Sequence, residues 1–254
     1  MKIRSINIRP LKVLSTLLLV VAMLVCMVMF SASQTVYFGY TARKVPIYYV
    51  NTPEKKIAIS FDAAWGADKT SDIIKICNEN NIKATFFLVG FWVEAYPDKV
   101  KEIFDAGFDI GTHSNTHPQM SKLNSKQMLH ELTTSSEMIS KITGGKVRFF
   151  RPPYGDYNDL LIDTASSLGL QTIQWDVDSL DWKGISASQI LSRITSSVKA
   201  GSIILCHNNA DHIVEALPMI ITNLKSAGYT FVKMSELVYE TGYTIDNNGM
   251  QTLK

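Results

Sequence analysis

The sequence predicts an α/β protein whose parallel sheet closes into an irregular seven-stranded (β/α) barrel of the TIM type. Short apolar segments alternate with amphipathic segments of helical periodicity over residues 55–242, and consecutive parallel strands need helical crossovers of this kind. Most of the short segments are apolar on both faces, as strands are when helices cover them. The alternative is an open doubly wound sheet. No Gly-x-Gly-x-x-Gly or phosphate-cradling loop follows the first strand, so we favour the closed barrel.

Each strand of the expected barrel is a short run of apolar and β-branched residues bounded by turn residues. We expect the seven strands at residues 57–61, 84–89, 108–112, 147–151, 170–175, 202–207 and 229–232. We expect helices over residues 68–80, 97–107, 124–145 and 158–168, from residue 186, around residue 218 and from residue 235.

Capping residues mark two of the helix starts. Asn124 with Gln127 and Ser186 with Gln189 have the spacing of a capping box, in which side chain and backbone satisfy each other across the first turn. Pro218 should kink the helix that contains it or restart it there, because proline lacks the amide hydrogen that a helix interior needs.

Two segments flank the barrel domain. Residues 31–54 are rich in aromatic and β-branched side chains, which favours a linker followed by an edge strand. Residues 243–254 are mostly polar, and we expect a flexible tail there.

The amino terminus predicts attachment to a membrane. Residues 1–12 form a basic segment, and an apolar run over residues 13–30 follows, interrupted only by Ser15 and Thr16. That run is long enough to cross a bilayer as a helix. The positive flank keeps the amino terminus in the cytoplasm, so the rest of the chain is exported. We favour an uncleaved single-pass anchor in the cell membrane. The alternative is cleavage after Ser33, which would secrete the domain.

Composition narrows the class further. Hydrophobic residues make up 46% and charged residues 19% of the chain, which is typical of a packed globular protein. The formal charge is +2 and depends on the basic amino terminus, so the sequence offers no footprint for nucleic acid. Three cysteines predict no disulfide framework. Cys206 and His207 are adjacent in a strand and point to opposite faces, which excludes a Cys-His catalytic pair.

Chemically capable side chains follow the expected strands. In parallel barrels such residues gather at the carboxyl ends of the strands. Two nearby imidazoles are the ligands that a borderline divalent metal such as zinc prefers. Asp62 follows strand one, His113 and His117 follow strand three, and Arg151 and Tyr154 follow strand four. Asp176, Asp178, Asp181 and Trp182 follow strand five, and His207 follows strand six.

Five motifs in this set resemble, in order, those of the polysaccharide deacetylase family, the carbohydrate esterases that share a chitooligosaccharide-deacetylase homology domain. The resemblance covers about residues 55–240. The run from Phe61 to Gly66, together with the single anchor, is most similar to the sporulation-associated, PdaB-like branch. The motifs are Ser60-Phe61-Asp62, His113-Ser114-Asn115-Thr116-His117, Arg151-Pro152-Pro153-Tyr154, Asp178-Ser179-Leu180-Asp181-Trp182 and Leu205-Cys206-His207.

The resemblance implies a role for each catalytic position. His113 and His117 would hold a divalent metal, and zinc is the metal that we expect. This metal would polarise an acetamide carbonyl and acidify a bound water. Asp62 would take the proton from that water, and Arg151 would keep Asp62 ionised and oriented. His207 would protonate the departing amine.

The remaining positions would support the acid and bind substrate. Asp181 would hold the tautomer of His207 and raise its pKa. The backbone N–H of Tyr154 would stabilise the oxyanion. Trp182 and Leu205 would wall the pocket for the acetyl methyl group.

One position departs from the family pattern. The first motif usually carries a second aspartate as the third metal ligand, and this chain has Ala63 there. Three alternatives follow. Asn115 or a carboxylate from strand five could replace the ligand, or water could replace it with weak binding or a different metal, or the protein could lack effective deacetylase activity.

The sequence therefore predicts a membrane-anchored hydrolase that removes N-acetyl groups from exported glycan, as a peptidoglycan N-deacetylase does in cell wall or spore cortex during sporulation. The alternative is a weak or inactive glycan-binding or scaffold protein on the same fold, which Ala63 favours. A third reading is metal-independent hydrolysis of another amide or imide. We expect a monomer that binds glycan, binds the membrane through residues 13–30 and does not bind nucleic acid.

Overall fold

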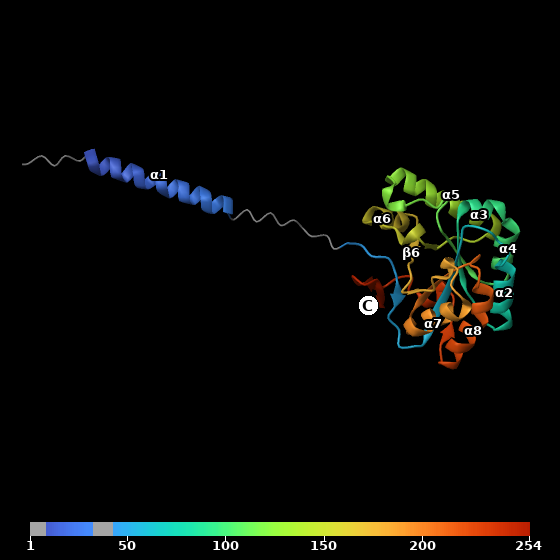
Figure 1. Cartoon of the computed structure of the whole chain (residues 1–254). Helices are drawn as coiled ribbons and strands as arrows, with labels where there is room; N and C mark the ends of the chain where they lie inside the picture. The colour runs from blue at the N-terminus through green and yellow to red at the C-terminus, as the bar shows by residue number, and fades with distance from the viewer. Residues whose placement is uncertain (1–8, 33–42) are drawn as a thin grey trace, which may run out of the picture. The chain divides into compact units, whose positions relative to one another are not determined.

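A computed structural model of the protein describes residues 9–32 and 43–254, which belong to two separate units (Figure 1). The first contains helix α1 (Arg9–Ala32). No helix in the described part of the chain is both long and apolar enough to cross a membrane, which leaves the span expected over residues 13–30 without support. Residues 1–8 of the basic segment and residues 33–42 of the linker, with the cleavage point at Ser33, lie outside the described residues.

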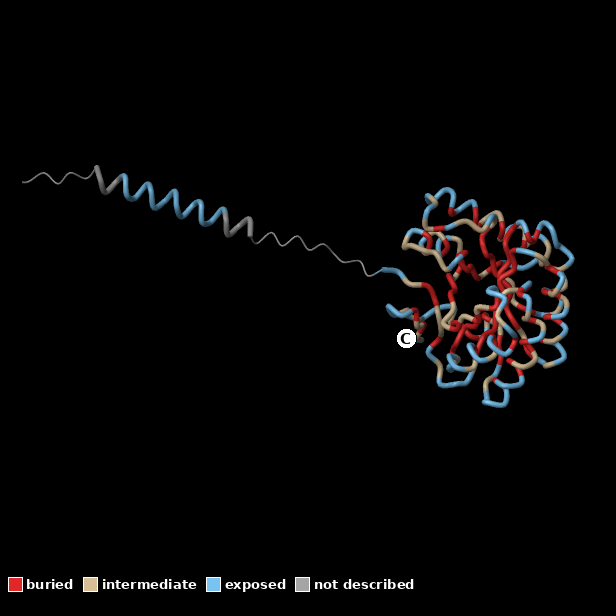
Figure 2. Tube along the Cα trace, in the orientation of Figure 1, coloured by how far each residue is buried: buried red, intermediate tan, exposed pale blue. Residues whose placement is uncertain are grey.

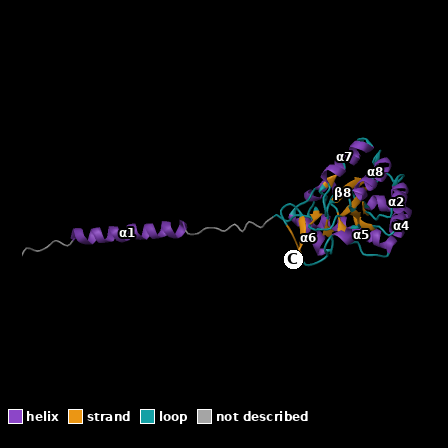
Figure 3. Ribbon diagram, turned by 90° about the horizontal axis from the view of Figure 1, so that it is seen from below, coloured by secondary structure: helices purple, strands orange, loops and turns teal. Residues whose placement is uncertain are grey.

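The second unit is built on a curled parallel sheet with helices around it (Figures 1 and 3). The strand order is β6-β5-β4-β3-β2-β8-β7, and β9 (Thr230–Phe231) pairs with the first residues of β2. Strands occur in all seven predicted segments. The sheet comprises β2 (Lys56–Ala63), β3 (Thr85–Leu88), β4 (Asp109–Thr112), β5 (Phe149–Phe150), β6 (Gln171–Thr172), β7 (Val177–Asp178) and β8 (Ile203–His207).

The sequence predicts a closed barrel, but the hydrogen-bonded sheet of the structure is interrupted near the fifth predicted strand. Within the predicted segment 170–175 only β6 forms, and it pairs with β5. The next strand, β7, lies beyond the segment and pairs with β8. The sheet is therefore a half-barrel, consistent with a (β/α)7 barrel whose hydrogen-bonded ladder has a seam. The segment before β1 (Tyr49–Val50) lies across that seam. The N–H of Ile47 donates to the carbonyl of Thr172, and the N–H of Gln174 donates to the carbonyl of Ile47.

The helices cover the outer face of the sheet, and buried residues concentrate between the two layers (Figure 2). Ile57, Ile59 and Phe61 face the helices, whereas Ala58 faces the interior of the half-barrel, as the two-residue period of a strand requires. The helices are α2 (Thr70–Glu79), α3 (Gly90–Ala95), α4 (Pro97–Asp105), α5 (Ser125–Thr143), α6 (Asp159–Ser167), α7 (Ala187–Ser197), α8 (Ile213–Ser226) and α9 (Met234–Leu237).

Local sequence signals explain most helix boundaries. Both predicted capping boxes are present, at Asn124 for α5 and at Ser186 for α7. Gly144 ends α5 at φ 70°, a conformation that glycine adopts without steric cost. We expected Pro218 to kink the helix or to restart it; the restart is wrong, because α8 continues through this residue, and the kink stays a prediction. The buried side chains on either side of Pro218, including Leu217 and Ile220, offset the one helical hydrogen bond that proline cannot make.

The prediction of a flexible tail from residue 243 is also wrong. Strands β10 (Tyr243–Ile245) and β11 (Met250–Leu253) form a hairpin, and β11 pairs with β1. Gln251 of β11 is completely buried, and its side-chain amide exchanges two hydrogen bonds with the backbone of Tyr239. Gln251 is thus paired rather than solvated, although most other polar residues of this segment are exposed.

Candidate active site

A cavity of about 630 Å³ opens at the carboxyl ends of the strands. The side chains that follow the expected strands line it, with two exceptions. Arg151 is fully buried beneath Asp62, and Asp176 accepts hydrogen bonds from Ser202 and Ile203 instead. The lining residues include Asp62, His113, His117, Tyr154, Asp181, Trp182, Leu205 and His207.

Asp62 and Arg151 form a buried ion pair at the base of this cavity. The Arg151 Nη1 donates to Asp62 Oδ1 at 2.7 Å, and its Nη2 donates to the carbonyl of Gln174 at 3.2 Å. The guanidinium lies 4.1 Å from the ring centroid of Phe87. Burial, the largest single influence, would raise the pKa of Asp62. The charge of Arg151, the smaller effects of His113 and His207 and the Arg151 hydrogen bond together outweigh it and hold that pKa below its ordinary value. Asp62 is therefore ionised at neutral pH.

His113 is fixed to the same arginine through the backbone. Its Nδ1 donates to the carbonyl of Arg151 at 2.7 Å, which assigns the ring proton to Nδ1. The Nε2 then carries a lone pair and lies 3.5 Å from Asp62 Oδ2. Burial lowers the pKa of His113, so its imidazole is neutral.

His117 completes a pair of neutral imidazoles. Its ring lies 5.0 Å from that of His113 and 4.6 Å from that of Tyr154, in edge-on contacts. Trp65 contacts it from another side at 5.1 Å. Burial, followed by the charge of His113, lowers the pKa of His117 to about 4. Neutral imidazole is the form that binds metals.

The donors around these imidazoles do not fit a three-ligand zinc site. Among the described residues, no three His, Cys, Asp or Glu side chains form a group that could hold a metal. The methyl group of Ala63 packs in the outer core beside Phe61. The Asn115 side chain lies against Gly90, and Asp181 is bound to His207, so neither replaces the missing ligand. The expected zinc site at His113 and His117 is therefore incomplete.

A second acid–base pair lines the same cavity. Asp181, which is completely buried, accepts from the backbone N–H of His207 at 2.8 Å and contacts its Nδ1 at 2.7 Å. Burial by itself would lower the pKa of His207, but the hydrogen bond and charge of Asp181 outweigh it and raise that pKa. The Asp181 contact leaves Nε2 for the cavity, so a protonated His207 could donate a proton from that atom.

Backbone strain concentrates in the motifs. Of the five non-glycine residues with positive φ in the described chain, four lie in the predicted motifs. Such conformations cost free energy and persist only where surrounding contacts impose them, often at functional sites. The four residues are Ser114 (φ 70°), His117 (φ 58°), Tyr154 (φ 61°) and Leu180 (φ 52°).

Glu131 imposes that conformation on the histidine loop and was missed by the sequence analysis. This buried carboxylate on α5 accepts from the backbone N–H groups of Asn115 and Thr116, both at 2.8 Å, and from the Thr116 hydroxyl at 2.7 Å. A buried position for glutamate on an amphipathic helix is the only sequence signal that could have indicated it.

The rim of the cavity carries exposed aromatic rings. Tyr154 and Trp182 are 64% and 58% exposed, so large apolar surfaces face solvent at the entrance. Trp65, which the sequence analysis did not select, is 60% exposed and lies 6.3 Å from Phe91. Leu205 is buried deeper in the cavity wall. This combination of a polar base and an aromatic rim is typical of carbohydrate sites.

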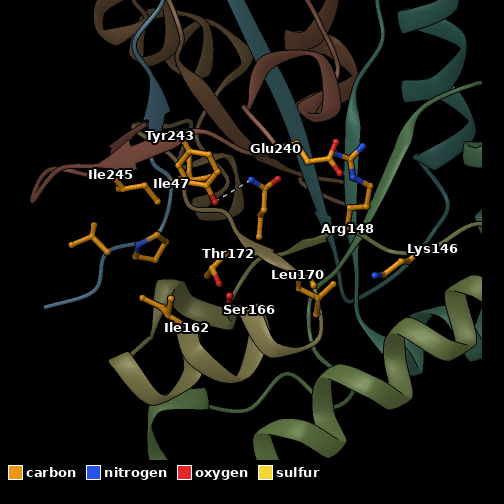
Figure 4. A pocket seen from close by; sticks show the side chains of 14 residues that line it. Ile47, Lys146, Arg148, Ile162, Ser166, Leu170, Thr172, Glu240, Tyr243 and Ile245 are labelled. Carbon is orange, nitrogen blue, oxygen red and sulfur yellow. Dashed lines mark hydrogen bonds and ion pairs between the residues drawn. The ribbon is translucent and has the colours of Figure 1, made fainter. Parts of the chain in front are cut away.

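A second cavity, of about 500 Å³, lies among β6, α6 and the carboxyl-terminal strands (Figure 4). Its wall includes Ile47, Ile162 and Ile245, and the ion pair between Arg148 and Glu240 borders it. It contains none of the predicted site residues, and the acid–base groups lie in the first cavity.

Comparison with known proteins agrees with this geometry. A family model described as polysaccharide deacetylase matches residues 49–173. The chain is 33% identical to a peptidoglycan-N-acetylglucosamine deacetylase of Bacillus cereus, over 72% of the chain and 68% of the relative. It is 32% identical to the peptidoglycan-N-acetylmuramic acid deacetylase PdaA of Bacillus subtilis, over 76% and 75% respectively.

A solved structure is also similar to this chain. The protein BA3943 of Bacillus anthracis, described as a CE4 family pseudoenzyme, is 36% identical, with a TM-score of 0.75 over 77% of this chain and 69% of that one. For two further curated relatives, the chain spans 61% and 42% of their length.

The fold and the site are those of a family of hydrolases that act on amide bonds. The chain belongs to the polysaccharide deacetylase family, whose members are typically metal-dependent and some of which are pseudoenzymes. Assignment to the PdaB-like branch stays a prediction.

Proposed function

We propose that this protein is a peptidoglycan N-deacetylase-like hydrolase that acts on exported glycan in cell wall or spore cortex. One observation carries the proposal: an ionised carboxylate, Asp62, and an imidazole with raised pKa, His207, line the same cavity. Amide hydrolysis needs these two groups, one to take a proton and one to give a proton. The relatives that act on peptidoglycan support the choice of substrate.

The proposed mechanism uses the two oxygens of Asp62 differently. Oδ1 is held by Arg151, and Oδ2 takes the proton from a water as its oxygen attacks the acetyl carbonyl carbon. The backbone N–H of Tyr154 stabilises the resulting oxyanion, a contribution of about 3 kcal/mol for one such donor. The C–N bond then breaks, His207 gives its proton to the departing amine, and acetate is released.

The binding residues hold the sugar for this attack. Trp182 and Leu205 enclose the acetyl methyl group, and Tyr154 contacts the ring from the rim. His113 and His117 lie beside the attacking oxygen as neutral groups. If they bind a divalent metal, it needs a ligand that Ala63 does not provide, so we derive no step from it.

The second candidate function is glycan binding with weak or absent catalysis. The incomplete ligand set around His113 and His117 favours it, as does the likeness to a pseudoenzyme. In this case the cavity would bind glycan and release no acetate.

An acetate-release assay with Asp62→Asn separates the two. The whole purified chain, incubated with N-acetylated peptidoglycan, should release acetate, and Asp62→Asn should abolish the release while the circular dichroism spectrum shows a folded domain. Asp105→Asn on α4, which removes an exposed carboxylate, serves as the control and should keep full activity. Glycan binding without acetate release at any added zinc, cobalt or manganese concentration would favour the second candidate. Equal activity of Asp62→Asn and the parent would refute the mechanism.

We also propose the cellular setting from the sequence. The basic segment and the apolar run over residues 13–30 support export, with the domain on the extracytoplasmic side of the cell membrane, either anchored or released after Ser33. A role in sporulation and a monomeric state are part of this proposal. Protease digestion of intact cells should remove the domain if it is outside, and protection until lysis would contradict the placement.

A further inference from the structure

Negative charge dominates the cavity that carries the proposed function. Among the described residues that line it, four are aspartates and none is lysine or arginine. Two of the four are paired within the site: Asp62 with Arg151, and Asp181 with His207, whose pKa this pairing raises. The other two are Asp178, which is half-buried, and Asp211, which is exposed.

These two carboxylates are poorly compensated. Asp178 Oδ1 accepts from the backbone N–H of Leu180, and no cation in the described chain lies within 4.0 Å of its carboxylate. Asp211 has one partner, the Lys69 Nζ at 4.0 Å, and its side chain is 77% exposed. A single exposed pair at that distance neutralises little.

The cations near the cavity are directed elsewhere. Lys69 donates to the backbone carbonyls of Asn209, Ala210 and Asp211. Lys183 lies over the ring of Trp182, 5.1 Å from its centroid. Arg193 donates to the Asp178 carbonyl and not to its carboxylate. The cavity is therefore electronegative, and an anionic group on a bound sugar would meet no cation among the described residues that line it except a protonated His207, which is already paired with Asp181.

This charge helps to distinguish between two candidate sugars. One relative is a deacetylase of N-acetylglucosamine and another is a deacetylase of N-acetylmuramic acid. The two sugars share the acetamido group but differ at the 3-oxygen. Glucosamine has a neutral hydroxyl there, and muramic acid has a lactyl ether that ends in a carboxylate or in a peptide. The aromatic rim of Trp65, Tyr154 and Trp182 provides the apolar surfaces on which a neutral pyranose ring packs.

On this basis, and resting on the proposed function, we propose that the cavity selects N-acetylglucosamine and discriminates against N-acetylmuramic acid with a free lactyl carboxylate, through Asp178 and Asp211. One uncompensated like charge at about 8 Å lowers affinity roughly twofold in a water-like dielectric and roughly thirtyfold in a partly buried one. The discrimination should weaken with salt, because the screening length is about 10 Å at 0.1 M.

The test compares three tetrasaccharides by quenching of the fluorescence of the tryptophans that line the cavity, with the whole chain. The first contains only N-acetylglucosamine. The second alternates N-acetylglucosamine with N-acetylmuramic acid. The third is the second with its lactyl carboxylates converted to methyl amides, which keeps their bulk and removes their charge.

We expect the neutral tetrasaccharide to bind roughly twofold to thirtyfold more tightly than the acidic one at low salt, and the amidated one to regain most of the difference. The double variant Asp178→Asn/Asp211→Asn should reduce this ratio to near one. Glu79→Gln, which removes an exposed carboxylate on α2, should leave it unchanged.

Equal or tighter binding of the acidic tetrasaccharide would overturn the proposal while leaving the proposed function intact. A preference that persists with the amidated sugar, or in the double variant, would also overturn it, because bulk and not charge would then be responsible. If none of the three sugars binds, the proposed function itself fails.

Discussion

His113 is hydrogen-bonded through Nδ1 to the backbone carbonyl of Arg151 at 2.7 Å, while the guanidinium of the same arginine holds Asp62 at 2.7 Å. One residue therefore positions both the imidazole and the carboxylate. Because Arg151 is completely buried directly after β5, this arrangement is set by the packed interior. The base and the first imidazole are expected to keep their relative geometry when substrate binds.

Removing the charge of Arg151 should destabilise the domain. In Arg151→Met the Asp62 carboxylate stays buried without its counter-ion, and breaking a buried pair from one side costs about 3–5 kcal/mol. Urea unfolding at neutral pH measures the loss. The double variant Asp62→Asn/Arg151→Met should be less destabilised than the sum of the two single variants, since no charge then remains unpaired. Additive losses would show that the pair does not stabilise the site.

Glu131→Gln should loosen the loop that carries the two histidines. Glutamine keeps one acceptor oxygen and turns an amide toward the N–H groups of Asn115 or Thr116, so at least one buried hydrogen bond is lost. We expect a stability cost of about 1–3 kcal/mol and a roughly tenfold to hundredfold fall in acetate release. The imidazole NMR signals of His113 and His117 should also shift. Glu137→Gln, at an exposed position of the same helix, is the control. Unchanged imidazole signals in Glu131→Gln would contradict this role.

The pair of Asp181 and His207 should stabilise the fold most at low pH. The pKa of His207 is raised above its unfolded value of 6.5. Its ion pair therefore contributes fully below about pH 6.5 and is lost as pH rises through the folded pKa. Asp181→Asn should cost about 1.5–3 kcal/mol near pH 5.5, and less near pH 9. Urea unfolding across this range, with NMR titration of His207, checks both. A cost that grows with pH would have the wrong sign.

Ala63→Asp should create the metal ligand that this chain lacks. Without metal the variant should be less stable than the parent, because Ala63 is completely buried. Zinc should raise the thermal unfolding temperature of the variant more than that of the parent, since binding to the folded state alone stabilises it. The gain should disappear in Ala63→Asp/His117→Ala. No zinc effect in the single variant would show that residue 63 cannot reach the imidazoles.

Much of the site could be predicted from the sequence because its residues follow apolar strands. Once Asp62, His113 and His207 are placed at strand ends, the parallel topology brings them together without further information. The capping boxes were equally accessible, since Asn124 and Gln127 depend only on each other.

Features that depend on distant parts of the chain could not be predicted. Glu131 lies in a helix, and its function follows only from where that helix packs. The early end of the fifth predicted strand and the separate strand β7 after it depend on pairing with β5 on one side and β8 on the other. Gln251 looked like part of a solvated tail because its partner, Tyr239, precedes the hairpin to which Gln251 belongs.

The pairing of β1 with β11 has a practical consequence. It places the first and last strands of the folded domain side by side, with Tyr49 in register with Met250. Because the two strands run parallel, the amino end of β1 and the carboxyl end of β11 lie at opposite ends of the pair, so a linker that runs back along it could join them. New termini could be opened at the exposed turn of Gly144 and Gly145. Such a circular permutant would retain the seam contacts of Ile47 and would allow the domain to be attached to a support at a point of choice.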